Sequence, residues 1–181
     1  MAQFEAFAPE VEVNGETVLT IVKAFPEFMQ IYAIKILSEN GIHNPRADKW
    51  YSQQAWLKAF KQISERYGAH TLYRIGKAIP ENAQFPTEID SIEKALASID
   101  IAYNMNHRNG DIGFYKVVSH DSTERKIVMH CKNPYPCDFD KGIITAMARK
   151  FNPDATVELD THKPSRKDGA NDSWYIISYG L

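Results

Sequence analysis

The residues of this chain best suited to chemistry lie around a Pro-Tyr-Pro turn. Cys131 and Cys137 flank that turn, and His130 precedes the first cysteine. Two thiolates and one imidazole are three zinc ligands, but the cysteine spacing is not that of the usual zinc motifs and no second cysteine pair exists. Cys137 is expected at a helix N-terminus, which favours a reactive thiolate, although Asp138 and Asp140 in the same turn oppose it. Structural thiols are therefore favoured, with redox and metal chemistry as alternatives.

Histidines offer a second possibility. The six histidines occur singly, and His107 stands at the expected end of a helix, as an iron ligand or, preferably, as a cap or surface group. The sequence contains no G-x-S-x-G, P-loop, H-E-x-x-H or G-x-G-x-x-G motif. With no nucleophile or acid–base constellation, an enzyme is the least favoured class.

The first half of the sequence has helical periodicity. It predicts helices over residues 15–25, 26–39, 47–67, 70–79 and 86–107, after a loosely attached lead-in over 1–13. Asn14 is the expected cap of the first helix, and its Asn-Gly pair also allows a hairpin over 11–18. Prolines 26 and 86 are expected to start helices, and Pro80 to end one. The clustered aromatics predict helix packing rather than a ligand cage: Trp50, Tyr51, Trp56, Phe60 and Tyr67.

In the second half the period changes to two. Strands are predicted over 112–118, 126–131, 155–159 and 174–179, with a helix over 138–151. The expected fold class is α+β in a single domain, 1–181. An N-terminal helical layer (15–108) is followed by an antiparallel sheet formed by a β-β-α-β-β unit (111–180).

Composition limits the partners. The chain has 181 residues, a formal charge of -2 and a pI near 6.3, which predicts no nucleic-acid partner. No apolar run is long enough for a membrane span, and the start has no secretory signal. With two cysteines, a reducing cytoplasm is the expected location.

Residues from about 86 to 179 resemble a ligand-binding superfamily. It contains the haem–nitric oxide-binding domain, the 4-vinyl-reductase-type domain and the Golgi-transport TRAPP subunits. The segments that carry the resemblance are Ile127-Val128-Met129-His130, Pro134-Tyr135-Pro136-Cys137, Lys141-Gly142-Ile143-Ile144, Thr156-Val157-Glu158 and Trp174-Tyr175-Ile176-Ile177. The resemblance implies helices packed against a curved antiparallel sheet around a mostly apolar pocket.

The functional residues of the superfamily carry over only in part. The haem-binding branch clamps its propionates with Y-x-S-x-R, and those positions here hold His130, Lys132 and Pro134. His107 lies roughly where that branch keeps its iron ligand. Cys137 matches a cysteine of the 4-vinyl-reductase-type branch, but the two later cysteines of that branch are missing.

The leading functional prediction is a non-enzymatic sensory or regulatory module. It binds a small apolar or amphipathic ligand between helices and sheet, and the candidate residues are Tyr103, His107, Phe114, Tyr115, Met129 and Cys137. The alternative is a haem- or metal-dependent sensor using His107 or the corner of Cys131, Cys137 and His130. The cofactor is left open.

The last strand raises the question of association. Trp174 and Ile176 should lie on one face of the strand, and Tyr175, Ile177 and Tyr179 on the other. Because both faces carry apolar or aromatic residues, both are expected to be buried. Either the strand is central in its own sheet or a second subunit covers it, and a homodimer is narrowly favoured. Tyr175→Glu should dissociate a dimer but unfold a monomer.

Overall fold

The computed structural model describes residues 3–180 and has the predicted α+β architecture. Its elements are β1 (Glu12–Asn14), α1 (Gly15–Lys23), η1 (Glu27–Met29), α2 (Gln30–Glu39), β2 (Trp50–Ser52), α3 (Gln53–Tyr67), α4 (Ala69–Asn82), α5 (Ile92–Met105), β3 (His107–Arg108), β4 (Phe114–Asp121), β5 (Lys126–Lys132), α6 (Cys137–Arg149), β6 (Thr156–Leu159), η2 (Arg166–Asp168) and β7 (Ser173–Ser178). The helices precede the β-β-α-β-β unit, as the sequence predicts.

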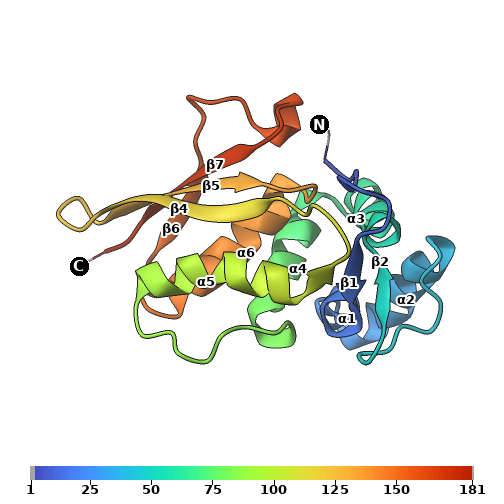
Figure 1. Cartoon of the computed structure of the whole chain (residues 1–181). Coiled ribbons are helices and arrows are strands. Elements are labelled where there is room, and N and C mark those ends of the chain that lie inside the picture. Colours follow the sequence, from blue (N-terminus) through green and yellow to red (C-terminus); the bar gives the residue numbers. More distant parts are fainter. Residues whose placement is uncertain (1–2, 181) are drawn as a thin grey trace.

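The main sheet has the strand order β4-β5-β7-β6, and every neighbouring pair is antiparallel. Figure 1 shows α5 and α6 beneath this sheet, with α4 alongside α6. Side chains alternate along the strands, so Tyr115, Met129 and Tyr175 are buried toward the helices. Their neighbours Phe114, His130 and Trp174 lie on the opposite face.

The last strand is central in its own sheet. β7 pairs with β5 on one side and β6 on the other, and Tyr175 and Ile177 are fully buried within the chain. The Tyr175 hydroxyl donates to the Cys137 carbonyl at the start of α6 (3.1 Å). The expectation that a second subunit covers Tyr175 is therefore wrong, because α6 of the same chain covers it. A homodimer by another surface stays a prediction.

A second, three-stranded sheet was not predicted. β1 lies between β2 and β3, and Val13 is paired with both Tyr51 and His107. Residues 50–52 pair with β1 and form a strand instead of the start of a helix. The helix α3 begins only after Ser52, which caps it by accepting from the Ala55 amide (3.3 Å). Three-residue strands are too short for a period of two to be visible.

From residue 4 onward the lead-in is packed, not loose as predicted, and residues 1–2 of the predicted lead-in lie outside the described residues. The Phe4 amide donates to the Pro134 carbonyl (2.8 Å), and the Ala6 amide donates to the Gln54 side chain (2.9 Å). Asn14 caps α1 as expected, by accepting from the Thr17 amide (2.9 Å). The hairpin alternative over 11–18 is wrong because only residues 12–14 are extended before the helix.

Three prolines act differently from expectation. Pro26 precedes a 3-10 turn before α2 begins at Gln30, and Pro86 lies in a loop before Ser91 caps α5. Pro80 lies inside the last turn of α4, which continues to Asn82. A proline so close to the C-terminal end removes one hydrogen bond without ending the helix.

Glycines set the crossing of α4 and α6. A Cβ at Gly76 would collide with the Phe139 carbonyl, and one at Gly142 would collide with the Tyr73 carbonyl. The two backbones therefore touch at this pair, which holds α6 against α4 and fixes the direction in which Phe139 and Ile143 point. Within residues 3–180, no single helix is long and apolar enough to cross a membrane.

Candidate functional site

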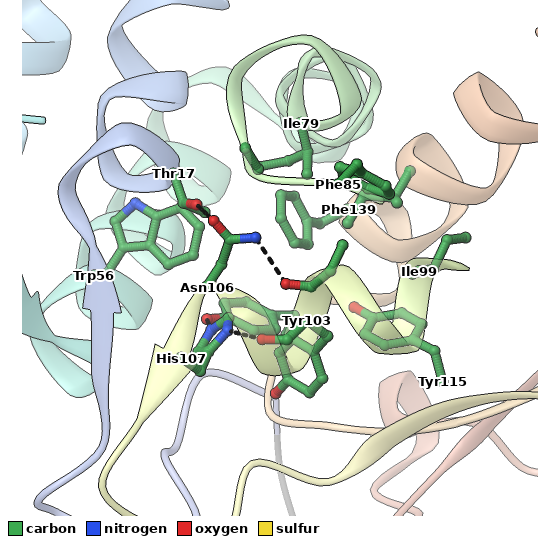
Figure 2. Close-up of a pocket in the computed structure, with 14 residues that line it drawn as sticks. Thr17, Trp56, Ile79, Phe85, Ile99, Tyr103, Asn106, His107, Tyr115 and Phe139 are labelled. Atoms are coloured by element: carbon green, nitrogen blue, oxygen red, sulfur yellow. Dashed lines mark hydrogen bonds between the residues drawn. The ribbon is translucent and has the colours of Figure 1, made fainter. Parts of the chain in front are cut away.

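A small cavity lies between the helices and the main sheet, and two of its lining residues, Ala83 and Phe85, are only partly buried. Its volume is about 30 Å³. Figure 2 shows aromatic and aliphatic side chains converging on it from α3, α4, α5, β4 and α6, with the polar Thr17 from α1. The lining residues are Thr17, Trp56, Ile79, Ala83, Phe85, Ile99, Ala102, Tyr103, Asn106, His107, Tyr115, Tyr135, Phe139 and Ile143.

His107 is the only titratable nitrogen base of this lining, and its tautomer follows from its partners. Nδ1 lies 2.8 Å from the Tyr103 carbonyl, which can only accept, so Nδ1 carries the proton. Nε2 must then accept from the Tyr135 hydroxyl at 2.6 Å. Burial lowers the pKa of His107 from 6.5 to about 4, so the ring is neutral near pH 7.

The hydrogen-bond chain continues to α3. The Tyr135 oxygen accepts from Gln53 Nε2 at 3.1 Å, and burial raises the pKa of Tyr135. The direction of every bond from Gln53 through Tyr135 and His107 to Tyr103 is thereby fixed. This buried chain carries no net charge at neutral pH.

Two buried polar atoms near these hydrogen bonds have no partner among the described residues. They are the Gln53 side-chain carbonyl oxygen and the Trp56 indole N–H. Both residues are fully buried, and their spacing of three places them on one face of α3. An unsatisfied buried group costs about 1–3 kcal/mol, so such groups in a native fold require an explanation. Of these two residues, only Trp56 belongs to the lining of the cavity, and Gln53 lies behind it.

Asn106 positions His107. Its side-chain oxygen accepts from Asn14 Nδ2 (2.7 Å) and the Thr17 hydroxyl (2.9 Å), and its amide nitrogen donates to the carbonyls of Gln84 (2.8 Å) and Ala102 (2.7 Å). The end of α5 is thus tied to the start of α1. Pairing of β3 with β1 then holds the next residue, His107, against the cavity.

A buried ion pair adjoins the cavity. Arg166 contacts Asp140, and both side chains are almost completely inaccessible to solvent. The Tyr115 hydroxyl, from the cavity lining, donates to Asp140 at 2.6 Å. Burial alone would lower the pKa of Arg166, but Asp140, together with Tyr175 and Cys137, outweighs burial and raises this pKa. The guanidinium charge is therefore neutralised within the protein.

Of the six predicted ligand-binding residues, Tyr103, His107 and Tyr115 line the cavity. The other three do not. Phe114 lies on the outer face of the sheet against His130 (ring centroids 5.1 Å apart), Met129 is core beneath β5, and Cys137 lies beside Ser173 (3.2 Å). Adjacent strand residues point to opposite faces, so Phe114 and Tyr115 cannot share one site.

The cysteine–histidine corner does not form a ligand set. His130 points outward, where it bonds Asp172 (2.6 Å) and stacks on Trp174 (4.1 Å between centroids), whereas Cys131 is buried in the core. Burial raises the pKa of Cys131, which disfavours its thiolate. Across residues 3–180, no three His, Cys, Asp or Glu side chains gather closely enough for a metal ion. The prediction of a metal site formed by Cys131, Cys137 and His130 is therefore wrong.

Sequence reasoning missed Gln53, Trp56, Tyr135 and Asn106. Trp56 was assigned to helix packing and Tyr135 to a turn. One signal was present: Gln53 precedes Trp56 and Phe60 by three and seven residues, which places a polar side chain on the apolar face of α3.

Haem does not fit the residues present. The cavity is about 30 Å³, whereas sites for drug-sized ligands span about 300–1,000 Å³. Tyr135 occupies the hydrogen-bonding position of His107 Nε2, which an iron would need. No Lys or Arg lines the cavity for propionates, and the nearby Arg166 is paired with Asp140.

No family model and no curated protein matches the chain. Solved structures do match it. An H-NOX protein from S. oneidensis in the Fe(II) ligation state has a TM-score of 0.67 at 13% identity, covering 93% of this chain and 96% of that chain. An oxygen-binding H-NOX domain related to soluble guanylate cyclases has a TM-score of 0.64 at 15% identity, covering 93% and 95%. A mutant of Cs H-NOX has a TM-score of 0.64 at 13% identity, covering 93% and 97%. The fold of this chain is therefore that of the H-NOX domains.

Proposed function

We propose that the protein is a sensory or regulatory module that binds a small uncharged molecule in the cavity, without haem. The observation that carries this proposal is the cavity itself, whose largely apolar lining includes His107, Tyr135 and Trp56 and carries no net charge at neutral pH. The similar solved structures include an H-NOX domain titled as oxygen-binding. The fold supports a sensory role by analogy, and the side chains of this chain decide the ligand.

The cavity restricts the ligand in size and polarity. A water molecule needs about 10–15 Å³, so about 30 Å³ admits water or a molecule of very few heavy atoms. The lining contains no Asp, Glu, Lys or Arg, and its one histidine, His107, is neutral at pH 7. Burying an ion there would be unfavourable. The expected ligand is small, uncharged and largely apolar, such as a short-chain alcohol.

The absence of haem is tested by absorbance. The purified protein should show no Soret band. After incubation with hemin, the only Soret absorbance should be that of free hemin. A stoichiometric Soret band that is lost in His107→Ala would instead establish the haem alternative.

Ligand binding is tested by nuclear magnetic resonance of the three tryptophan indole N–H groups. Trp56→Phe assigns the Trp56 signal, and methanol or ethanol then serves as the probe. A saturable shift of the Trp56 signal is expected, with Trp174 as the internal control. In Ala102→Leu, which fills the cavity, the shift should vanish. A linear shift, or the same shift in Ala102→Leu, would refute binding at this site.

A further inference from the structure

The largest group of exposed apolar side chains lies on η1 and α2, far from the cavity. Eight large hydrophobic residues are exposed in the described chain, and four of them lie here: Phe28, Ile31, Tyr32 and Ile34, exposed by 79, 70, 53 and 42%. The opposite side of α2 packs inward through Ala33, Ile36 and Leu37. Figure 1 shows α2 at one end of the molecule, opposite the turn between β4 and β5.

This patch is of the size that marks an interaction site. With about 200 Å² per large side chain, the four residues expose on the order of 490 Å². A typical stable interface buries about 800 Å² on each partner. The patch therefore suits a weak association.

The charges that border the patch suit a second copy of the chain. Glu27 lies four residues before Ile31 and Lys35 four residues after it, and both are exposed. Two antiparallel copies related by a two-fold axis at Ile31 would place Glu27 of each opposite Lys35 of the other, and Phe28 opposite Ile34. Such pairing of residue i with j and j with i is what a two-fold interface requires.

Neither charge is strongly engaged within its own chain. Glu27 forms no ion pair among the described residues, and Lys35 reaches Glu39 only at 3.9 Å, with its side chain 69% exposed. Both are available to a partner. We propose that η1 and α2 form a weak, two-fold symmetric homodimer interface centred on Ile31, with Glu27 and Lys35 pairing across it. This interface does not depend on the ligand proposed for the cavity.

Sedimentation equilibrium of the full chain from about 5 to 500 μM tests the interface, a range chosen for the weak association that this area implies. The mass should rise with concentration from 20.6 kDa toward twice that value. Ile31→Glu should raise the dimer dissociation constant at least about tenfold, because it buries a charge at the centre. Ile101→Glu, at an exposed apolar position of α5, is the matched control and should leave the constant unchanged.

Charge reversal tests the symmetry. Glu27→Lys and Lys35→Glu should each weaken the dimer severalfold, and the double variant should restore it, because like charges then become opposite again. Circular dichroism should show that all variants stay folded, since the changed residues are exposed.

Three results would overturn the proposal: a monomer at every concentration, a dimer insensitive to Ile31→Glu, or no rescue by the double variant. Co-sedimentation with phosphatidylcholine–phosphatidylglycerol vesicles that requires Ile31, together with a monomeric protein, would assign the patch to a lipid surface instead.

Discussion

At the residue scale, His107 shows how burial changes the chemistry of a side chain. An exposed histidine titrates near pH 6.5, but burial among aromatics lowers the pKa of this ring, although the bond from Nδ1–H to the Tyr103 carbonyl acts in the opposite direction. The same geometry that keeps the ring neutral leaves Nε2 as an acceptor inside the cavity. The residue is thus a fixed acceptor for the Tyr135 hydroxyl and does not titrate near neutral pH.

The lowered pKa of His107 predicts a pH dependence of stability. The folded pKa is about 4 and the ordinary value 6.5, so between these values the unfolded chain holds a proton that the folded chain lacks. Stability is therefore full above about pH 6.5 and falls by about 3 kcal/mol as the pH drops to about 4. Urea unfolding of the wild type and of His107→Gln at pH 7.5 and 4.5 measures the contribution of His107 to the free energy of unfolding. The stability advantage of the wild type should shrink at pH 4.5, whereas a pH-independent difference would contradict the assignment.

The Arg166–Asp140 pair predicts strong coupling. Removing one partner leaves the other charge buried and unpaired. Asp140→Asn and Arg166→Met should therefore each lower the free energy of unfolding by about 3–5 kcal/mol. The double variant should lose clearly less than the sum, which a double-mutant cycle by urea unfolding will show. Asp48→Asn, in the exposed Arg46–Asp48 pair, is the control and should leave the unfolding midpoint unchanged. Additive losses at Asp140 and Arg166 would argue against a direct pair.

At the element scale, the contact of α4 with α6 governs the shape of the site. Both helices contribute lining residues, Ile79 from α4 and Phe139 and Ile143 from α6. Their separation is set by Gly76 and Gly142, where the backbones meet without side chains between them. A wider separation would change the cavity on two sides at once.

Gly142→Ala should therefore be destabilising. In an ordinary helix interior the change from glycine to alanine stabilises by about 1 kcal/mol. Here the new Cβ would collide with the Tyr73 carbonyl, and such overpacking costs about 1–3 kcal/mol. Thermal and urea unfolding check the sign. Lys141→Ala in the same helix should stay within about 0.5 kcal/mol of the wild type, and a stabilised Gly142→Ala would show that the helices are not in close contact.

At the scale of the whole molecule, the main sheet presents one buried and one partly exposed face. Its buried face packs on α5 and α6, and this accounts for the apolar residues Tyr175 and Ile177 on that side of β7. The apolar pattern of β7 therefore reflects burial within one chain. The surface with unburied apolar side chains lies instead on α2, at the other end of the molecule.

Two neighbouring residues of β7 should respond in opposite ways to charge. Tyr175→Glu would bury an unpaired carboxylate in the core, so the variant should lose its cooperative unfolding transition. Ile176→Lys points to the outer face, opposite Glu158, and should remain folded. Circular dichroism with thermal unfolding separates the two. A folded, monomeric Tyr175→Glu protein would restore the idea of a subunit interface at this strand.

The sequence by itself determined the features that depend on local spacing. Apolar periods of about 3.6 and of two marked the helices and the four main strands, and the order of these elements implied the α+β class. The cap at Asn14 was equally local. Tyr103 at the end of α5, His107 in β3 and Tyr115 on the inner face of β4 do line the cavity, and their role in binding a ligand stays a prediction.

Only the tertiary structure decided which distant residues meet. Gln53 and Tyr135 are 82 residues apart and bond only because α3 packs against the loop before α6. The three-residue strands β1 and β2 form because they pair with each other, and neither is long enough to show a period. Phe114 and Met129 have apolar side chains like those of the lining, but Phe114 points to the outer face of the sheet and Met129 packs in the core away from the cavity. Local backbone preference fixes the period of each element, whereas the composition of a buried site depends on long-range contacts that no local pattern contains.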